Sequence, residues 1–391
     1  MIHRRRYRPV AQRINRRQFI GRAGVFAGAV ALGPSILAAC GGDDDDDSSG
    51  GGGGSDSIAI SSWLGYMSDQ SLADFEAAIG ITPNYDETIN DNNEYFTKIR
   101  PNLSQGEGIG REGMVLTDWM ASRLINQVDP PWVQQFDEAA FPNKSNMLAV
   151  LASPEFDPQR LYSAPWATGI TGIAYNISTT GGEVRTVDDF LNVSGTKTVL
   201  TEMRDTVGLF MQATGADPAN PSVASAEPAF DALQKALDDG QIDGANGQDY
   251  VADLGAGNLA AAFAWSGDVA QITLDNPDVR FAVPESGGML WSDNFLIPIG
   301  TDKVTQATQW INFFYDPANA AVLTAEIQYI SPVQGVAEAL TAMGGDAAAL
   351  VDNPLVVPTD EFLASVSIFG TLDETAEEEF DQRFSEILGT G

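Results

Sequence analysis

Aromatic rings and carboxylates occur together at two points of this sequence, each within or at the end of an apolar run. Trp265 closes a run that begins at Leu259, and Asp268 follows three residues later, while Trp291 and Asp293 lie two residues apart in a second run. A carboxylate accepts hydrogen bonds from an alkylammonium group, and the negative face of an indole ring attracts the same cation and covers its methylene chain. The two pairs therefore predict a binding site for a cationic amine.

Other predicted strands end in side chains of the same kinds. Ligands of open α/β sheets bind at the carboxyl ends of strands, so we expect these side chains to share one cleft. Trp291 and Asp293 should project from one face of a strand, about 6.6 Å apart. Arginine and lysine are nearly absent from these strand ends, with Arg204 as the exception. The further candidates are Trp63 with Tyr66, then Thr117, Asp118 and Trp119, and finally Glu202 and Asp205, which should share one face of a helix.

These residues also have structural explanations, and the sequence leaves the choice open. A tryptophan can belong to a core, and an acid at the start of a helix can serve as N-cap or interact with the helix dipole. Asp293 is harder to explain in this way, because an acid inside an apolar strand needs a polar partner. The alternatives are a core position for Trp63 or Trp119, an N-cap at Ser266 or Asp268, a helix-dipole contact for Glu202 and Asp205, and packing beside Pro332 for Tyr329.

Composition excludes much of the usual chemistry of enzymes. Among 391 residues the only histidine is His3 and the only cysteine is Cys40, both close to the N-terminus. A folded body without them has no histidine base, no thiolate nucleophile, no His/Cys zinc site and no internal disulfide. Any chemistry that remains must come from carboxylates, hydroxyls, amides, aromatic rings and the few lysines and arginines. We expect neither a cofactor nor a metal site, and a binding protein in preference to an enzyme. The length is sufficient for two lobes with a buried cleft.

The N-terminal segment predicts export and attachment to a membrane. Residues 1–39 combine a basic start with an apolar stretch, as signal peptides do. Arg16 and Arg17 resemble the twin-arginine export motif, and the residues before Cys40 resemble a lipobox, which implies that Cys40 is lipidated. A retained transmembrane helix is the alternative, but the apolar stretch is shorter than the roughly 20 residues that a span needs. Residues 40–57 predict a lipidated cysteine followed by a flexible Gly/Asp/Ser tether.

The charge of the remaining chain is strongly negative. Residues 1–39 contain eight of the 21 basic residues and none of the 54 acidic residues, so 13 basic residues and a formal net charge of −41 remain. Nucleic acid is therefore not expected as a partner. A negative field attracts cationic solutes, but it also keeps a protein soluble at high salt. The sequence leaves open whether the charge serves ligand steering or salt adaptation.

From residue 57 onward, short apolar strands alternate with amphipathic helices. Residues 69–79 predict a helix between Ser68 as N-cap and Gly80 as stop signal. Residues 111–127 and 197–215 each predict a strand that leads directly into a helix. Such alternation predicts an α/β fold with a mainly parallel sheet covered by helices.

Seven segments of the chain carry a family resemblance when they are taken in order. They are SSWLGYMSDQSLADFEAAIGITPNYDE, NNEYFTKI, YSAPWATGITGIAYN, LTEMRDTVGL, AFAWSGDVAQ, GGMLWSDNFLIPIG and AEIQYISPVQGVAEAL. Together, from about Ile58 to Leu388, they resemble the substrate-binding proteins of spermidine and putrescine ABC importers. The order and spacing of the segments make the resemblance specific, since no single segment does.

The resemblance implies a two-lobed, hinged fold of the periplasmic-binding-protein type II class. Lobe 1 would comprise residues 58–167 and 292–338, and lobe 2 residues 168–291 and 339–391, with crossover strands between them and the ligand cleft at their junction. The lobes would close on a polyamine, putrescine or spermidine, and deliver it to a membrane permease powered by a cytoplasmic ATPase. Its lipid at Cys40 would hold the protein on the outer face of the bacterial cytoplasmic membrane, in the cell envelope or periplasmic space.

The resemblance also implies roles for individual residues. Thr117 stands where the family has a small hydroxyl residue and would hydrogen-bond an amine. Leu64 and Gly65 depart from the family, which commonly has a hydroxyl and an acidic residue there, and Asp118 is the candidate replacement. This departure leaves open which amine is bound. The aromatic walls would be Trp63, Tyr66, Trp119, Trp265, Trp291 and Tyr329, and the ammonium partners Glu202, Asp205, Asp268 and Asp293.

Two other functions remain open from the sequence. A sugar- or amino-acid-binding protein of the same architecture would stack its tryptophans on rings, and a sugar site would need fewer acids in the cleft. A secreted hydrolase would use a pair of carboxylates such as Asp268 and Asp293. The hydrolase fits least well, because nothing in the sequence supplies an oxyanion hole or a Gly-rich phosphate loop.

Overall fold

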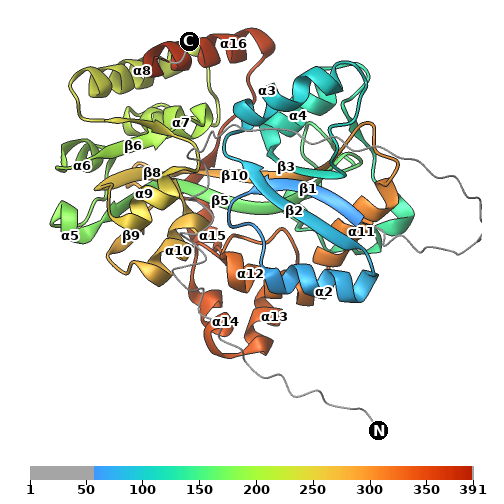
Figure 1. Cartoon of the computed structure of the whole chain (residues 1–391). Helices are drawn as coiled ribbons and strands as arrows, with labels where there is room; N and C mark the ends of the chain where they lie inside the picture. The colour runs from blue at the N-terminus through green and yellow to red at the C-terminus, as the bar shows by residue number, and fades with distance from the viewer. Residues whose placement is uncertain (1–56, 390–391) are drawn as a thin grey trace, which may run out of the picture. The chain divides into compact units, whose positions relative to one another are not determined.

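A computed structural model describes residues 57–389, apart from the side chain of Glu374, and these residues form a curled sheet surrounded by helices (Figure 1). The predicted signal peptide, Cys40 and the tether up to residue 56 lie outside the described residues. Within the described part, eleven strands form one sheet. Its main path runs in the order β2 (Thr82–Ile89), β1 (Ser57–Trp63), β3 (Gly113–Thr117), β10 (Gly288–Pro298), β5 (Ser163–Asn176), β8 (Ala261–Trp265), β6 (Lys197–Leu200) and β7 (Gly244–Asn246). Off this path, β4 (Val133–Gln134) and β11 (Val366–Ile368) pair with β10, and β9 (Val279–Ala282) pairs with β5.

The helices follow the strands along the chain and cover the sheet. The N-terminal part contains α2 (Asp69–Ile79), α3 (Asn92–Leu103), α4 (Asp118–Asn126), α5 (Ile177–Thr180), α6 (Val187–Asn192), α7 (Met203–Ala213) and α8 (Val223–Asp238). The C-terminal part contains α9 (Tyr250–Ala256), α10 (Ser266–Asp275), α11 (Val304–Phe314), α12 (Pro317–Ile327), α13 (Val336–Met343), α14 (Gly345–Ala349), α15 (Asp360–Leu363) and α16 (Glu374–Leu388). Short 3-10 turns occur at Glu138–Ala140, Pro142–Asn146, Ala149–Leu151 and Leu350–Asp352.

Two long strands, β5 and β10, connect the two ends of the sheet. β10 pairs with β3 through Asp293–Leu296, and β5 pairs with β8 through Thr171–Tyr175, while β5 and β10 pair with each other along most of their length. These pairings are antiparallel, whereas β1 with its neighbours and β6 with its neighbours are parallel. The expectation of a mainly parallel sheet is therefore wrong for the centre, because the two crossover strands run against the strands beside them.

The predicted strand and helix units are confirmed. Ser68 caps α2 by accepting a hydrogen bond from the backbone N–H of Ser71, and Gly80 ends the helix with a φ of 80° in the left-handed region. β3 leads into α4 at Asp118, and β6 leads into α7. Each of these junctions brings a polar side chain to a strand end, as the candidate site requires.

The core beneath the centre of the sheet leaves no room beside Phe295 of β10. This ring is fully buried and packs near Phe136 and Trp166. Gly113 of β3 lies directly against it, because a Cβ atom at position 113 would come within 2.4 Å of the Phe295 ring. The glycine is therefore required by the close approach of strand and ring. Trp166 is itself a core residue, stacked on Trp310 at a centroid distance of 6.0 Å.

Replacing Gly113 by alanine is expected to destabilise the protein by about 1–3 kcal/mol, because a buried aromatic ring would have to move. Chemical denaturation followed by circular dichroism measures the change. The matched control is Gly244→Ala in β7, where an added Cβ would meet nothing within 4 Å. Equal stability of the two variants would contradict the packing argument.

Candidate functional site

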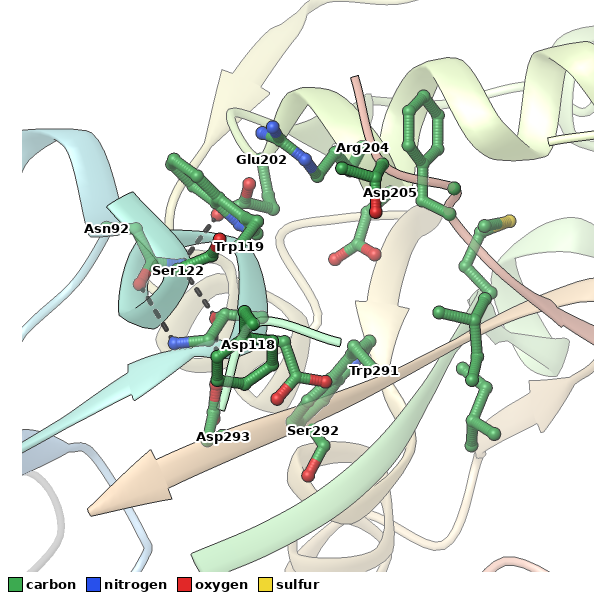
Figure 2. Close-up of a pocket in the computed structure, with 18 of the residues that line it drawn as sticks. Asn92, Asp118, Trp119, Ser122, Glu202, Arg204, Asp205, Trp291, Ser292 and Asp293 are labelled. Carbon is green, nitrogen blue, oxygen red and sulfur yellow. Dashed lines mark hydrogen bonds between the residues drawn. The ribbon is translucent and has the colours of Figure 1, made fainter. Parts of the chain in front are cut away.

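A cavity of about 460 Å³ lies where the ends of β1, β3, β8 and the middle of β10 come together (Figure 2). Ten of the twelve predicted ligand-binding residues line it, so side chains that are far apart in the sequence do converge as expected. They are Trp63, Tyr66, Thr117, Asp118, Trp119, Glu202, Asp205, Trp265, Trp291 and Asp293. The other two, Asp268 and Tyr329, lie behind the wall.

Asp293 is the most constrained carboxylate of the cavity. It lies opposite Thr117 in the pairing of β10 with β3, and it accepts hydrogen bonds from Thr117 Oγ1 at 2.7 Å and from Tyr66 Oη at 2.6 Å. Burial raises the pKa of Asp293 to about 7, while the two hydroxyl donors lower it. An acid inside an apolar strand thus has polar partners, but both of them are neutral.

Asp205 and Glu202 lie on a neighbouring wall at the start of α7. Asp205 accepts a hydrogen bond from the indole N–H of Trp265 at 2.8 Å, and Glu202 accepts one from Asn92 Nδ2 at 2.9 Å. Burial raises the pKa of Asp205 to about 6 and raises that of Glu202 well above its ordinary value, with Asp91 and Asp205 adding to the effect on Glu202. Glu202 occupies the N-cap position of α7 but makes no side-chain cap hydrogen bond. Both acids therefore point to the cavity and not to the helix end.

Asp118 is held by a buried polar chain. Asn294, the residue after Asp293, donates from Nδ2 to Asp118 Oδ1 at 2.6 Å and accepts from Arg160 Nη1 at 2.8 Å. The pairing of β10 with β5 shifts register between Asp293 and Asn294. Such a bulge changes the direction of side chains. Here the side chain of Asp293 reaches the hydroxyls of Tyr66 and Thr117, and the side chain of Asn294 reaches Asp118 and Arg160. Burial raises the pKa of Asp118.

Five of the six predicted aromatic residues form one connected cluster, in which Tyr329 lies behind the rings that line the cavity; Trp119 is not part of it. Trp265 lies edge-on to Trp63 at a centroid distance of 5.6 Å and to Trp291 at 6.1 Å, and Tyr329 contacts Trp291 at 5.9 Å and Tyr66 at 4.9 Å. Trp63 is only 3% exposed, so it is a core residue and a cavity-lining residue at the same time. The two interpretations of Trp63 that the sequence left open, a core residue or a site residue, therefore both hold.

Asp268 differs from Asp293, although both follow a tryptophan in sequence. Its carboxylate accepts hydrogen bonds from Tyr250 Oη and Tyr329 Oη, both at 2.7 Å, and from Gln248 Nε2 at 3.0 Å. Burial raises its pKa to about 6. α10 begins at Ser266 and has no side-chain cap, so the alternative of helix capping by Asp268 is wrong. Asp268 instead fixes the ring of Tyr329, which supports the aromatic wall from behind.

Arg204, the one basic side chain among the predicted strand ends, is paired at the rim of the cavity. Its guanidinium lies over the ring of Trp119 at 4.1 Å, and Nη2 donates to Glu377 Oε1 at 2.5 Å. Glu377 also accepts from Arg123 Nη2 at 3.1 Å. Of the six acids that line the cavity, Glu377 is therefore ion-paired. The others form no ion pair within residues 57–389; they are Asp118, Glu202, Asp205, Asp293 and the exposed Glu155.

Comparison with known proteins gives the family. A family described as bacterial extracellular solute-binding protein matches residues 70–354. The chain belongs to this family. The putrescine-binding periplasmic protein PotF of Escherichia coli is 25% identical over 296 residues, which cover 70% of this chain and 77% of PotF.

Solved structures confirm the predicted two-lobed fold of this solute-binding protein. A putative spermidine/putrescine ABC transporter from Listeria monocytogenes matches with a TM-score of 0.73 and 22% identity, over 85% of this chain and 99% of the other. The spermidine/putrescine substrate-binding protein PotD of Streptococcus pneumoniae matches with a TM-score of 0.68 and 21% identity, over 85% and 98%. At these identities the likeness shows the fold alone.

Two features of the solute-binding protein concern the part of the chain that the structure describes. No helix there is both long enough and apolar enough to cross a membrane. No group of three or more histidine, cysteine, aspartate or glutamate side chains within residues 57–389 is arranged to hold a metal ion.

Some cavity residues of the solute-binding protein were not predicted from the sequence. Asn92 and Gln248 are buried amides that bind the acids described above. Gln248 also pairs with the backbone of Leu64, donating to its carbonyl at 2.9 Å and accepting from its N–H at 3.0 Å. The departure from the family at Leu64 is therefore accompanied by a backbone contact to a distant amide. A single buried amide cannot be predicted from the periodicity of a sequence. Asn92 could have been found only because it lies in a segment that carries the family resemblance.

The unliganded protein is expected to lose stability as pH rises from about 4 to about 7, with Asp293 as a main contributor. Its pKa is raised to about 7 in the folded state, from an ordinary value of 3.8, so the folded state binds the proton more tightly than the unfolded state across this window. The proton bound to Asp293 therefore stabilises the folded state fully below about pH 4. This stabilisation, on the order of a few kcal/mol, is lost as pH rises to about 7. Thermal unfolding between pH 4.5 and 7.5 measures the slope.

In Asp293→Asn the decline with pH should be shallower than in the wild type, because one titrating group has been removed. Asp346→Asn in α14 is the matched control, since Asp346 is exposed and the substitution removes the same charge. Parallel pH profiles for the wild type and Asp293→Asn would refute the assignment.

Proposed function

We propose that this protein captures a linear polyamine, putrescine or spermidine, in the cavity between its lobes and delivers it to an ABC permease driven by a cytoplasmic ATPase. The observation that carries the proposal is a cavity whose walls combine buried acids without ion pairs and a connected cluster of aromatic rings. We also infer that the protein is not an enzyme, since binding and release are all that such a role requires.

The electrostatics of the cavity favour a cationic ligand. A buried carboxylate without a cation loses hydration and receives only partial compensation from neutral donors. Asp293 and Asp205 are in this situation, with pKa values of about 7 and about 6. An ammonium group would supply the missing charge. Two charged hydrogen bonds and two desolvated ring contacts at about 2 kcal/mol each amount to on the order of 8 kcal/mol, which corresponds to micromolar affinity before ordering costs.

The names of the relatives support the same class of ligand. PotF is described as putrescine-binding, and PotD as the substrate-binding protein of a spermidine/putrescine transporter. A sugar would leave the acids of the cavity unpaired. A hydrolase would need two acids that face the same cavity, whereas Asp293 lines the cavity and Asp268 lies behind its aromatic wall.

We propose the lobe boundaries stated above, with hinges in β5 and β10. Lobe 1 would be residues 58–167 and 292–338, and lobe 2 residues 168–291 and 339–391. Two of the three boundaries, 167/168 and 291/292, are supported by the long strands, because they fall inside β5 and β10, which pair with neighbours at each end of the sheet. The third boundary, 338/339, falls inside α13. Small backbone rotations in β5 and β10 would change the width of the cavity.

Isothermal titration calorimetry with putrescine, spermidine and glucose tests the ligand class. Either polyamine should bind with a Kd in the micromolar range or below, and glucose should give no heat. Asp293→Asn should weaken polyamine binding at least tenfold, because a charge-assisted hydrogen bond is lost. Asp346→Asn, exposed and outside the cavity, should bind as the wild type does. Absence of heat with both polyamines would refute the proposal.

Export and lipid anchoring are a separate part of the proposal, supported by the motifs at Arg16, Arg17 and Cys40. In a bacterial host with twin-arginine export and lipoprotein processing, Cys40→Ser should move the protein from the membrane fraction to the soluble envelope fraction. Replacing Arg16 and Arg17 by lysine should retain it inside the cell. Immunoblots of the fractions measure both, and an unchanged membrane fraction for Cys40→Ser would contradict lipid anchoring.

A further inference from the structure

The end of the cavity away from Asp293 is formed by a segment close to the C-terminus. Residues Ile368–Leu372 line the cavity, and the strand that leads into them, β11, pairs in parallel with β10 at Gly288–Leu290. The backbone N–H of Gly370 donates to the carbonyl of Pro218 at 2.9 Å. The segment is thus fixed on two sides, and its ribbon, in faint red, passes beside the cavity in Figure 2.

Along β10 the cavity is acidic beside Asp293 and mainly apolar beside Leu290. Asp293 pairs with Thr117 of β3, whereas Leu290 pairs with Ile368 of β11. Three residues of strand separate these two positions, which corresponds to about 10 Å. The cavity-lining residues at the far position are Met289, Leu290 and Ile368–Leu372, of which only Thr371 has a polar side chain.

The acid that α16 contributes to the cavity is already paired. Glu377, the first acid of α16 that lines the cavity, binds Arg204 and Arg123 and accepts a third hydrogen bond from Gln127 Nε2 at 3.0 Å. An ammonium group beside Glu377 would therefore find an acid that already has its partners, and it would lose hydration there with little in return. An uncharged, apolar group would lose little hydration free energy at this end.

The size of the cavity leaves room for such a group. Putrescine has six non-hydrogen atoms, which occupy roughly 180 Å³ at about 30 Å³ per water-sized group. The cavity of about 460 Å³ is more than twice as large. A diamine that pairs with Asp293 and Asp205 would leave the space between Met289 and Leu372 to another part of the ligand.

We propose that this apolar end is a subsite for an uncharged, apolar substituent on one nitrogen of the amine, and that Ile368–Leu372 determines this specificity. The inference rests on the proposed function, since the charged part of the same ligand lies against the acids. The segment follows residue 354, where the match to the family ends, so the subsite is built by a part of the chain that the family match does not include.

Calorimetry with putrescine and with N-benzyl-1,4-diaminobutane tests the subsite in the full chain. The benzyl compound should bind at least tenfold more tightly than putrescine. Ile368→Ser, at a side chain that is 59% exposed and safe for folding, should weaken binding of the benzyl compound at least threefold and leave putrescine binding within twofold. Leu372→Ser should have a larger effect in the same direction, with thermal unfolding as the check that the variant is folded.

The matched control is Leu363→Ser in α15, which is 37% exposed and does not line the cavity. It should bind both compounds as the wild type does. Equal or weaker binding of the benzyl compound would overturn the subsite, and so would a benzyl preference that both Ile368→Ser and Leu372→Ser retain. No heat with either compound would instead count against the polyamine function on which the inference rests.

Discussion

The carboxylate of Asp293 lies in the middle of the sheet, 2% exposed, and two hydroxyl groups hold it where a cation would be the stronger partner. Removing a charge from water without a counter-ion is costly, and the folded protein accommodates it by hydrogen bonding and by a raised pKa. The arrangement of the site follows from this one constraint. Tyr66 comes from the loop after β1, Thr117 from the end of β3, and the bulge beside Asn294 turns the next side chain to Asp118.

The strands that carry the site also connect the two ends of the sheet. β10 contributes Asp293 and Trp291 to the cavity, and it pairs with β3 on one side and with β11 and β5 elsewhere along its length. A ligand that binds Asp293 therefore acts on a strand shared by both proposed lobes. If the proposed lobes move about β5 and β10, this shared strand would connect occupancy of the cavity to the angle between them without an additional relay of side chains.

A second layer behind the aromatic wall explains how large rings keep a defined orientation. Asp268 binds the hydroxyls of Tyr250 and Tyr329, and Tyr329 in turn packs against Tyr66 and Trp291. Aromatic contacts in offset or edge geometry add modest energy beyond burial, but fixed rings lose less entropy when a ligand binds. The acid that resembled Asp293 in sequence thus serves the wall from behind.

The α/β class, the strand and helix units, and the residue types of the cavity could be predicted from the amino-acid sequence. They follow from local periodicity, from caps such as Ser68, and from the chemistry of rings and acids. The sequence could not separate Asp268 from Asp293, since both follow a tryptophan at a strand. The folded chain shows that Asp293 binds Tyr66, 227 residues away, while Asp268 is enclosed by two tyrosines. The direction of the central strands and the position of Ile368–Leu372 beside the cavity likewise became visible only in the folded chain. The physical reason is the same in each case: the partner is set by strand pairing and packing across the chain, and no local pattern records which distant side chain will fill the space.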